Sequence, residues 1–331
     1  MRRPGPGRLL EMKSMAPALA IPLVILLLAA RTSVPAAALL PEIDSIASRS
    51  TSDTARVLRV EEVGMRLGAG DLREPTGVAI GTRGFIYVAD AMAGKVFRYS
   101  RKGVSLEFER SPHNAAFYPI DVADQEAYVL VLDYSRNQLM RYTHTGAYLD
   151  VLLSFDQFDR VRPVSLTAGA GGRIITADVS NHAVMLWTPL FDIELTIGEF
   201  GQGEGRFNEP RGAAFLPNDG VVVVESGNRR LQFFSPSGRY ERSATPPAET
   251  PFVFPRSVSV DDAGAVFVCD AQAGRVFIFE SDGSYVTDIH SYKGEAISPT
   301  AAVAAWDGAL YVADLRSRSI LVYRILHPRE K

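Results

Sequence analysis

The sequence is poor in the residues that usually carry covalent or metal chemistry. Of 331 residues, one is cysteine (Cys269), five are histidine and two are tryptophan. A single cysteine excludes a disulfide within the chain, so the folded protein depends on packing for its stability. The sequence contains no H-E-x-x-H, G-x-S-x-G or Walker motif. It therefore carries no signature of a metalloprotease, a serine hydrolase or a nucleoside triphosphatase.

The chain also lacks an excess of positive charge. Its formal net charge is −3, and its 47% hydrophobic and 22% charged residues are typical of a globular chain with a large core. Residues 1–38 hold five basic residues and one acidic residue, so the charge of the remainder falls to −7. Because an acidic domain has no overall attraction for nucleic acid, we expect no nucleic-acid binding.

Residues 1–41 have the pattern of a signal peptide or an N-terminal membrane anchor. Basic residues precede an uncharged run of 16 residues from Met15 to Ala30, and alanines follow at positions 36–38. As a helix, that run would span about 24 Å, which is shorter than the roughly 30 Å core of a bilayer and favours cleavage. An uncleaved anchor stays open, because residues 32–41 are also uncharged. The pattern predicts an exported protein that is periplasmic, on the cell surface or secreted, and that touches a membrane only through this segment.

Six copies of one unit fill the rest of the chain. A proline followed by a β-prone run recurs at Pro75, Pro119, Pro163, Pro210, Pro255 and Pro299, with spacings of 44 to 47 residues. An acidic residue follows each proline after 14 or 15 residues, at Asp90, Asp133, Asp178, Glu225, Asp270 and Asp314. A period held over six copies indicates a repeat architecture, in which each copy is one supersecondary unit.

Each copy reads as four short antiparallel strands. In the fifth copy, β-prone runs over residues 255–260, 265–269, 275–279 and 285–289 are separated by turn residues, without helical periodicity. The third turn of several copies ends in glycine (Gly103, Gly146, Gly238 and Gly283), which provides the positive φ of a tight hairpin. Four strands per copy, six times over, predict an all-β, six-bladed β-propeller over about residues 55–325.

The strand count also predicts how the ring closes. The first five copies carry a fourth strand, for example residues 106–109 and 193–197, whereas the sixth copy stops near Tyr323 without one. An unpaired β-prone run, residues 56–63, precedes the first copy. Pairing this N-terminal strand with the last blade would leave no open edge, which β-propellers avoid.

On these residues the chain resembles the NHL-repeat family, and more narrowly its exported, bacterial members. The likeness is strongest over residues 196–211, TIGEFGQGEGRFNEPR, and residues 225–231, ESGNRRL. Blades two and six depart most, because they lack the glycine after proline and the basic residue before the aliphatic one. The resemblance implies the six-bladed fold. Related propellers include binding scaffolds and also lyases and lactonases that hold one metal ion near the channel.

We interpret the six repeated acidic residues as structural. Each falls at a strand end, where its carboxylate can accept backbone N–H bonds from the following turn. Glu225 is the exception, because its side chain is longer than that of the five aspartates. Its loop is therefore a mild candidate for another role.

Three histidines are weak candidates for a metal site. His113, His182 and His290 occupy connections that emerge on one face of a propeller, where three imidazoles could hold zinc. They come from separated blades and do not occupy equivalent positions of the repeat. This favours the interpretation that they are solvated loop residues without a metal. The first expectation is therefore no cofactor, and the alternative is a single Zn or Ca ion.

The best candidate site is the mouth of the central channel, beside the repeated prolines. Arg162, Arg211 and Arg256 come from consecutive blades and should form a basic arc, which Tyr118, Asp121 and Phe254 face or flank. Forked, charge-assisted hydrogen bonds from such an arc suit a carboxylate, a phosphate or an acidic peptide. The alternative is that Glu74 and Glu209 neutralise the arginines as ordinary ion pairs between blades.

Two functions stay open at this point. The first is a monomeric, non-enzymatic scaffold outside the cytoplasm that presents its loop-rich face to a protein, peptide or glycan partner. The second is a metal-dependent propeller enzyme of the lyase or lactonase type, with His113, His182, His290 or Asp121 as ligands.

Overall fold

The computed structural model describes residues 58–81, 83–110, 117–304 and 308–327, without the side chains of 302–304. All of these residues belong to one compact unit, residues 51–331. The predicted signal or anchor segment, residues 1–41, lies outside the described residues. No helix among the described residues combines the length and the apolar composition that crossing a membrane requires.

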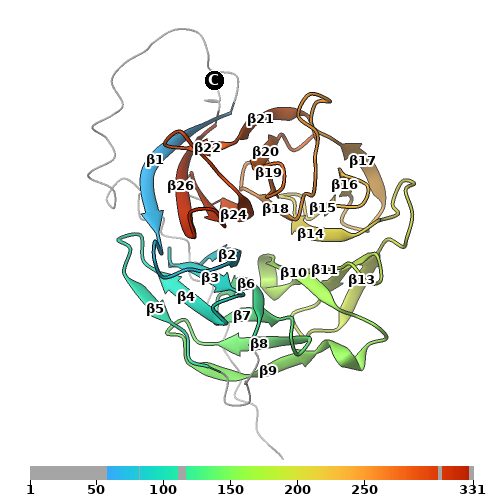
Figure 1. The fold of residues 1–331 in the computed structure, drawn as a ribbon. Helices are drawn as coiled ribbons and strands as arrows, with labels where there is room; N and C mark the ends of the chain where they lie inside the picture. Colours follow the sequence, from blue (N-terminus) through green and yellow to red (C-terminus); the bar gives the residue numbers. More distant parts are fainter. Residues whose placement is uncertain (1–57, 82, 111–116, 305–307, 328–331) are drawn as a thin grey trace, which may run out of the picture. The chain divides into compact units, whose positions relative to one another are not determined.

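Six antiparallel sheets of four strands surround a central channel, as the six-copy period predicted (Figure 1). Blades one to three comprise β2 (Pro75–Ile80), β3 (Ile86–Asp90), β4 (Lys95–Tyr99) and β5 (Ser105–Glu107); β6 (Pro119–Gln125), β7 (Tyr128–Asp133), β8 (Gln138–Tyr142) and β9 (Tyr148–Ser154); β10 (Pro163–Ala168), β11 (Ile174–Asp178), β12 (Ala183–Trp187) and β13 (Ile193–Ile197). Blades four to six comprise β14 (Pro210–Phe215), β15 (Val221–Glu225), β16 (Arg230–Phe234) and β17 (Tyr240–Ala244); β18 (Ser257–Val260), β19 (Val266–Asp270), β20 (Arg275–Phe279) and β21 (Tyr285–Ile289); β24 (Pro299–Ala304), β25 (Ala309–Asp314), β26 (Ser319–Leu326) and β1 (Arg59–Leu67).

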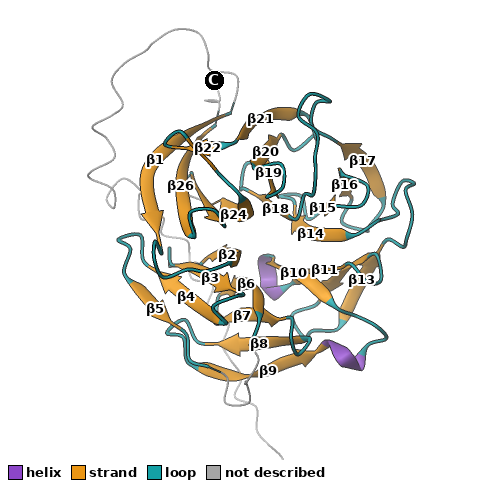
Figure 2. Cartoon of the chain, viewed as in Figure 1, coloured by secondary structure: helices purple, strands orange, loops and turns teal. Residues whose placement is uncertain are grey.

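The remaining elements are short. A two-residue hairpin, β22 (Ser291–Tyr292) and β23 (Glu295–Ala296), lies between blades five and six. Among the described residues, helix is confined to two single turns, η3 (Phe155–Gln157) and η4 (Ala170–Gly172), which are purple in Figure 2. The fold is therefore all-β, in agreement with the sequence-based expectation.

The last blade is closed by the first strand. β1 pairs antiparallel with β26, so the two ends of the described chain share a sheet with β25 and β24. The predicted closing strand stopped at Val63, but β1 continues to Leu67. The register shifts between Glu62 and Arg66, where Gly64 has a φ of 79°, and this bulge lets the strand pass the glycine.

Hydrophobic packing joins each blade to the next. The second strand of each blade is buried, apart from the partly exposed first residues of β7 and β25. Six clusters of buried apolar residues lie between consecutive blades, including one between blades six and one that contains Leu67 and Ile320. The ring is thus held by the same kind of contact at its closure as elsewhere.

The third turns behave as the glycine pattern predicted. Gly103, Gly146, Gly238 and Gly283 have φ values of 81°, 84°, 76° and 89°. Each donates its N–H to the carbonyl three residues earlier, which closes a tight hairpin between the third and fourth strands.

Candidate functional site at the channel mouth

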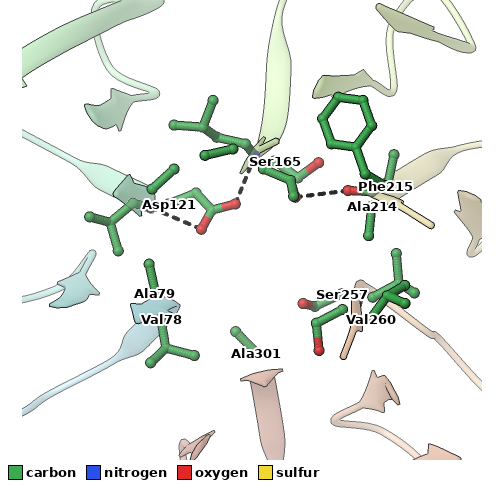
Figure 3. Close-up of a pocket in the computed structure, with 18 of the residues that line it drawn as sticks. Val78, Ala79, Asp121, Ser165, Ala214, Phe215, Ser257, Val260 and Ala301 are labelled. Atoms are coloured by element: carbon green, nitrogen blue, oxygen red, sulfur yellow. Dashed lines mark hydrogen bonds between the residues drawn. The ribbon is translucent and has the colours of Figure 1, made fainter. Parts of the chain in front are cut away.

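The first strands of the six blades form the wall of the channel. Within the described residues, the channel contains two adjoining cavities of about 230 and 260 Å³. Asp121, Ser165, Ser257 and Ala301 line both cavities, so they mark the level at which the cavities meet. Figure 3 shows these four residues around the open centre of the ring.

Those four residues belong to a set of six that stand two positions after the repeated prolines: Gly77, Asp121, Ser165, Gly212, Ser257 and Ala301. Five of the six are glycine, serine or alanine, which keeps the channel open at this level. Asp121 is the exception, and it brings the only charge that the set contributes. Space for its side chain comes from Gly77 in the neighbouring blade.

Asp121 is held in place by the backbone. Its Oδ1 accepts a hydrogen bond from the N–H of Val122 at 2.9 Å, and its Oδ2 accepts one from the N–H of Leu166 in blade three at 2.8 Å. Desolvation by the surrounding wall raises the pKa of Asp121 to about 7, although the two backbone bonds act in the opposite direction. A carboxyl group in the channel thus exchanges its proton near neutral pH.

The larger cavity, which we call the arginine mouth, opens where the first strands begin. Its charged and aromatic lining residues are Glu74, Tyr118, Asp121, Tyr134, Arg211 and Arg256. Arg211 lies with its guanidinium carbon 4.6 Å from the centre of the Phe254 ring, and its Nη2 is 3.2 Å from Glu209 Oε2. The Nε of Arg211 is buried and has no hydrogen-bond partner among the described residues.

Arg256 is more available than Arg211. Its side chain is exposed in the mouth and forms no ion pair or hydrogen bond with another described residue. Desolvation by the walls lowers the pKa of Arg256, and the nearby charge of Arg211 acts in the same direction. Since an arginine stays protonated in proteins, the mouth holds two positive charges that are close enough to repel each other.

Arg162 does not line the arginine mouth. Its guanidinium stacks over the ring of Tyr134 at 4.2 Å and donates through Nη2 to the Tyr134 carbonyl oxygen at 3.3 Å. The expected arc of three arginines is therefore a pair, Arg211 and Arg256. The ring of Phe254 packs against the guanidinium of Arg211. Tyr118 and Asp121 lie in the lining as expected.

The proposed neutralising ion pairs between blades do not form among the described residues. Glu209 pairs with Arg211 of the same blade, whereas the half-buried Glu74 carboxylate forms no ion pair or hydrogen bond with another described residue. Desolvation and the negative charge of Glu74 raise the pKa of Tyr118, and the positive charge of Arg256 acts in the opposite direction. The mouth therefore contains unpaired charges of both signs.

The repeated acidic residues hold the mouth in shape. Asp90 accepts hydrogen bonds from the N–H of Ala93 in the following turn and from the N–H of Glu74, both at 2.9 Å. Asp133 and Asp270 bind the N–H groups of Tyr118 and Phe254 in the same way. The predicted capping role is confirmed. The hydrogen bonds from these carboxylates to the N–H of the residue before each proline were not predicted.

Glu225 also ties its turn to the segment before the proline, but through other partners than the aspartates use. Its carboxylate accepts hydrogen bonds from the N–H of Asn208 at 2.9 Å and from the Nε of Arg230 at 2.7 Å. Gln232 donates to it at 2.8 Å. The longer side chain reaches these additional partners, so its loop gives no sign of a distinct site.

The histidines do not converge among the described residues. His182 accepts the N–H of Glu209 through Nδ1 at 3.1 Å and packs against Phe200, and His290 lies 3.3 Å from Asp288. His113 lies outside the described residues. Within the described part, no group of three or more His, Cys, Asp or Glu side chains is placed to hold a metal ion.

Comparison with known proteins supports the fold and a partial sequence relationship. No family model matches the chain. Over 124 residues, or 37% of this chain, the sequence is 27% identical to Protein brain tumor of Drosophila melanogaster, of which the match spans 12%. The chain is a six-bladed β-propeller, and part of its sequence is similar to a segment of that protein.

Two solved propellers illustrate the structural relationship. A virginiamycin B lyase from Staphylococcus aureus, crystallised with quinupristin, aligns with a TM-score of 0.60 at 14% identity over 81% of this chain and 100% of that one. A gluconolactonase from Xanthomonas campestris aligns with a TM-score of 0.60 at 15% identity over 77% of this chain and 87% of that one. At such identities the likeness concerns the fold, because function depends on the site that a fold carries.

Proposed function

We propose that this protein is a non-enzymatic binding scaffold that acts outside the cytoplasm. It captures a protein, peptide or glycan partner through an anionic group that enters the arginine mouth. The observation that carries the proposal is the pair Arg211 and Arg256 on the wall of a cavity of about 260 Å³, with the Arg256 side chain free of any partner among the described residues. A carboxylate or phosphate placed there would receive charge-assisted hydrogen bonds.

The location follows from the export pattern of residues 1–41, and the scaffold role follows from the lack of catalytic motifs. A net charge of −7 after residue 38 argues against nucleic acid as the partner. We expect the domain to act as a monomer, since its ring has no open sheet edge at the closure.

The test uses a short polyglutamate peptide as the probe and isothermal titration as the measurement. The variant Arg211→Gln with Arg256→Gln should bind at least about tenfold more weakly than the natural sequence, because each lost charged hydrogen bond is worth about 1.5–3 kcal/mol. The melting temperature should fall by no more than about 4 °C, since no buried apolar contact is removed.

The matched control removes two positive charges elsewhere. Lys102→Gln with Arg239→Gln changes exposed residues in the turns after β4 and β16 and should leave the affinity unchanged. If the two double variants bind the peptide equally, attraction by net charge explains the binding and the mouth is not the site.

A second candidate is a propeller enzyme of the lyase or lactonase type. It is favoured by Asp121, a channel carboxylate with a pKa of about 7, which is the value that suits a general base at neutral pH. Metal analysis of the dialysed protein separates the two candidates. Stoichiometric zinc or calcium would support the enzyme, and a metal-free protein would leave the binding scaffold.

A further inference from the structure

We propose that the arginine mouth recognises a dipolar group, with a cationic amine directed to Glu74 and an anionic group directed to Arg211 and Arg256. This inference rests on the proposed function, because it specifies the ligand of the same site. The ligand class is a short peptide that carries a free amine and a carboxylate, or the corresponding end of a larger chain.

The two kinds of charge come from different blades, and Arg211 lies across the ring from Glu74. Glu74 precedes β2 in blade one, and its N–H bond to Asp90 and the bond from the N–H of Ala91 to its carbonyl fix its backbone. Arg211 lies in β14 of blade four, and Arg256 directly precedes β18 of blade five. In a closed ring of six blades, blade one faces blade four across the channel, as Figure 1 shows.

Glu74 and Arg256 are not in ion-pair contact with each other, and neither side chain has a partner among the other described residues. They nevertheless act on each other at a distance, since the charge of Glu74 raises the pKa of Arg256 against the effect of desolvation. Two unpaired opposite charges on the walls of one cavity create a field across it. That field favours a molecule whose own charges are separated in the opposite sense.

The remaining lining fits an amine beside Glu74. Tyr118 lines the mouth and is acted on by the charges of both Glu74 and Arg256, and Asp121 provides a second acceptor where the two cavities meet. An aromatic ring and carboxylates together are suitable neighbours for an ammonium group. The cavity of about 260 Å³ is slightly below the usual range for small-molecule pockets, which limits the inserted part to about the size of a dipeptide.

A pair of probes that differ only at the amine tests the inference. Glycylglutamate has a free amine, and N-acetylglycylglutamate has the same carboxylates without the positive charge. For the natural sequence, we expect acetylation to weaken binding by about tenfold, as titration calorimetry or NMR titration would show. Glu74→Gln should weaken glycylglutamate to the level of the acetylated form and leave the acetylated form unchanged.

The control variant is Glu204→Gln, which removes an exposed carboxylate from the linker between β13 and β14 and should preserve the difference between the probes. Equal binding of the two probes to the natural sequence, with both lost in the double arginine variant, would overturn the dipolar inference while the proposed function stands. Binding of polyglutamate without any binding of glycylglutamate at millimolar concentration would overturn it as well. If neither polyglutamate nor the dipeptides bind, both proposals fall.

Discussion

Gly77 in blade one and Asp121 in blade two approach so closely that a Cβ on Gly77 would lie 2.5 Å from Asp121 Oδ1 and 2.7 Å from Asp121 Cα. The second of these atoms is backbone and cannot rotate away. The glycine is therefore required by the neighbouring blade, and it connects the position of the channel carboxylate to the packing of two first strands.

This contact predicts that Gly77→Ala destabilises the protein by about 1–3 kcal/mol, the usual cost of overpacking. Denaturant unfolding measures the effect. Gly203→Ala is the matched control, because its Cβ would meet only Arg206 Cδ at 3.7 Å and its backbone needs no positive φ. The control should be neutral or slightly stabilising through the unfolded chain. Equal stability of the two variants would contradict the close approach.

The raised pKa of Asp121 predicts a dependence of stability on pH. The ordinary pKa of 3.8 applies to the unfolded chain and a value of about 7 to the folded one, so the folded state keeps a proton that the unfolded state loses. The contribution of Asp121 to the free energy of unfolding therefore falls as the pH rises from about 4 to 7. Asp121→Asn has no ionisable group at this position, so this pH-dependent fall in the free energy of unfolding should disappear.

We expect the free energy of unfolding of Asp121→Asn, relative to the natural sequence, to increase by about 1–3 kcal/mol between pH 4 and pH 8. Denaturant unfolding at several pH values measures the difference. Asp262→Asn, which changes an exposed carboxylate in the turn before β19, is the control for charge removal. A relative stability of Asp121→Asn that stays constant over this range would show that Asp121 ionises normally.

Closure of the ring by β1 predicts that alanine substitutions at two of its residues lower the free energy of unfolding by different amounts. Leu67 is 2% exposed and packs between blades six and one, whereas Val63 is 36% exposed on the same strand. Leu67→Ala should cost about 2–5 kcal/mol, as for other buried leucines. Val63→Ala should cost less than about 1 kcal/mol. Thermal or denaturant unfolding compares the two, and similar losses would mean that β1 does not complete the last blade in solution.

The repeat period predicted the blades well because spacing, turn glycines and strand-end acids are local features. The strand bounds of residues 275–279, 285–289 and 193–197 agree with the structure. β1 was predicted too short, since a glycine in a bulge resembles a strand end in the sequence.

The site was predicted less completely, because it depends on side-chain directions. The position of Arg162 beside its proline gave no sign that its guanidinium would stack on Tyr134. Tyr134 itself follows a strand-end acid, and only the folded ring brings it to the mouth. Glu74 was expected to neutralise an arginine, but its carboxylate forms no ion pair among the described residues.

The pairing of β1 with β26 has a consequence for the order of events during biosynthesis. β1 is made first and its partner strand is made last, so the sixth sheet cannot form until translation has passed Leu326. Until then, the hydrophobic sides of blades one and five lack their final neighbour, and a stalled or clipped product would present them to chaperones and proteases. The ring can therefore close only after β26 has been synthesised and has paired with β1.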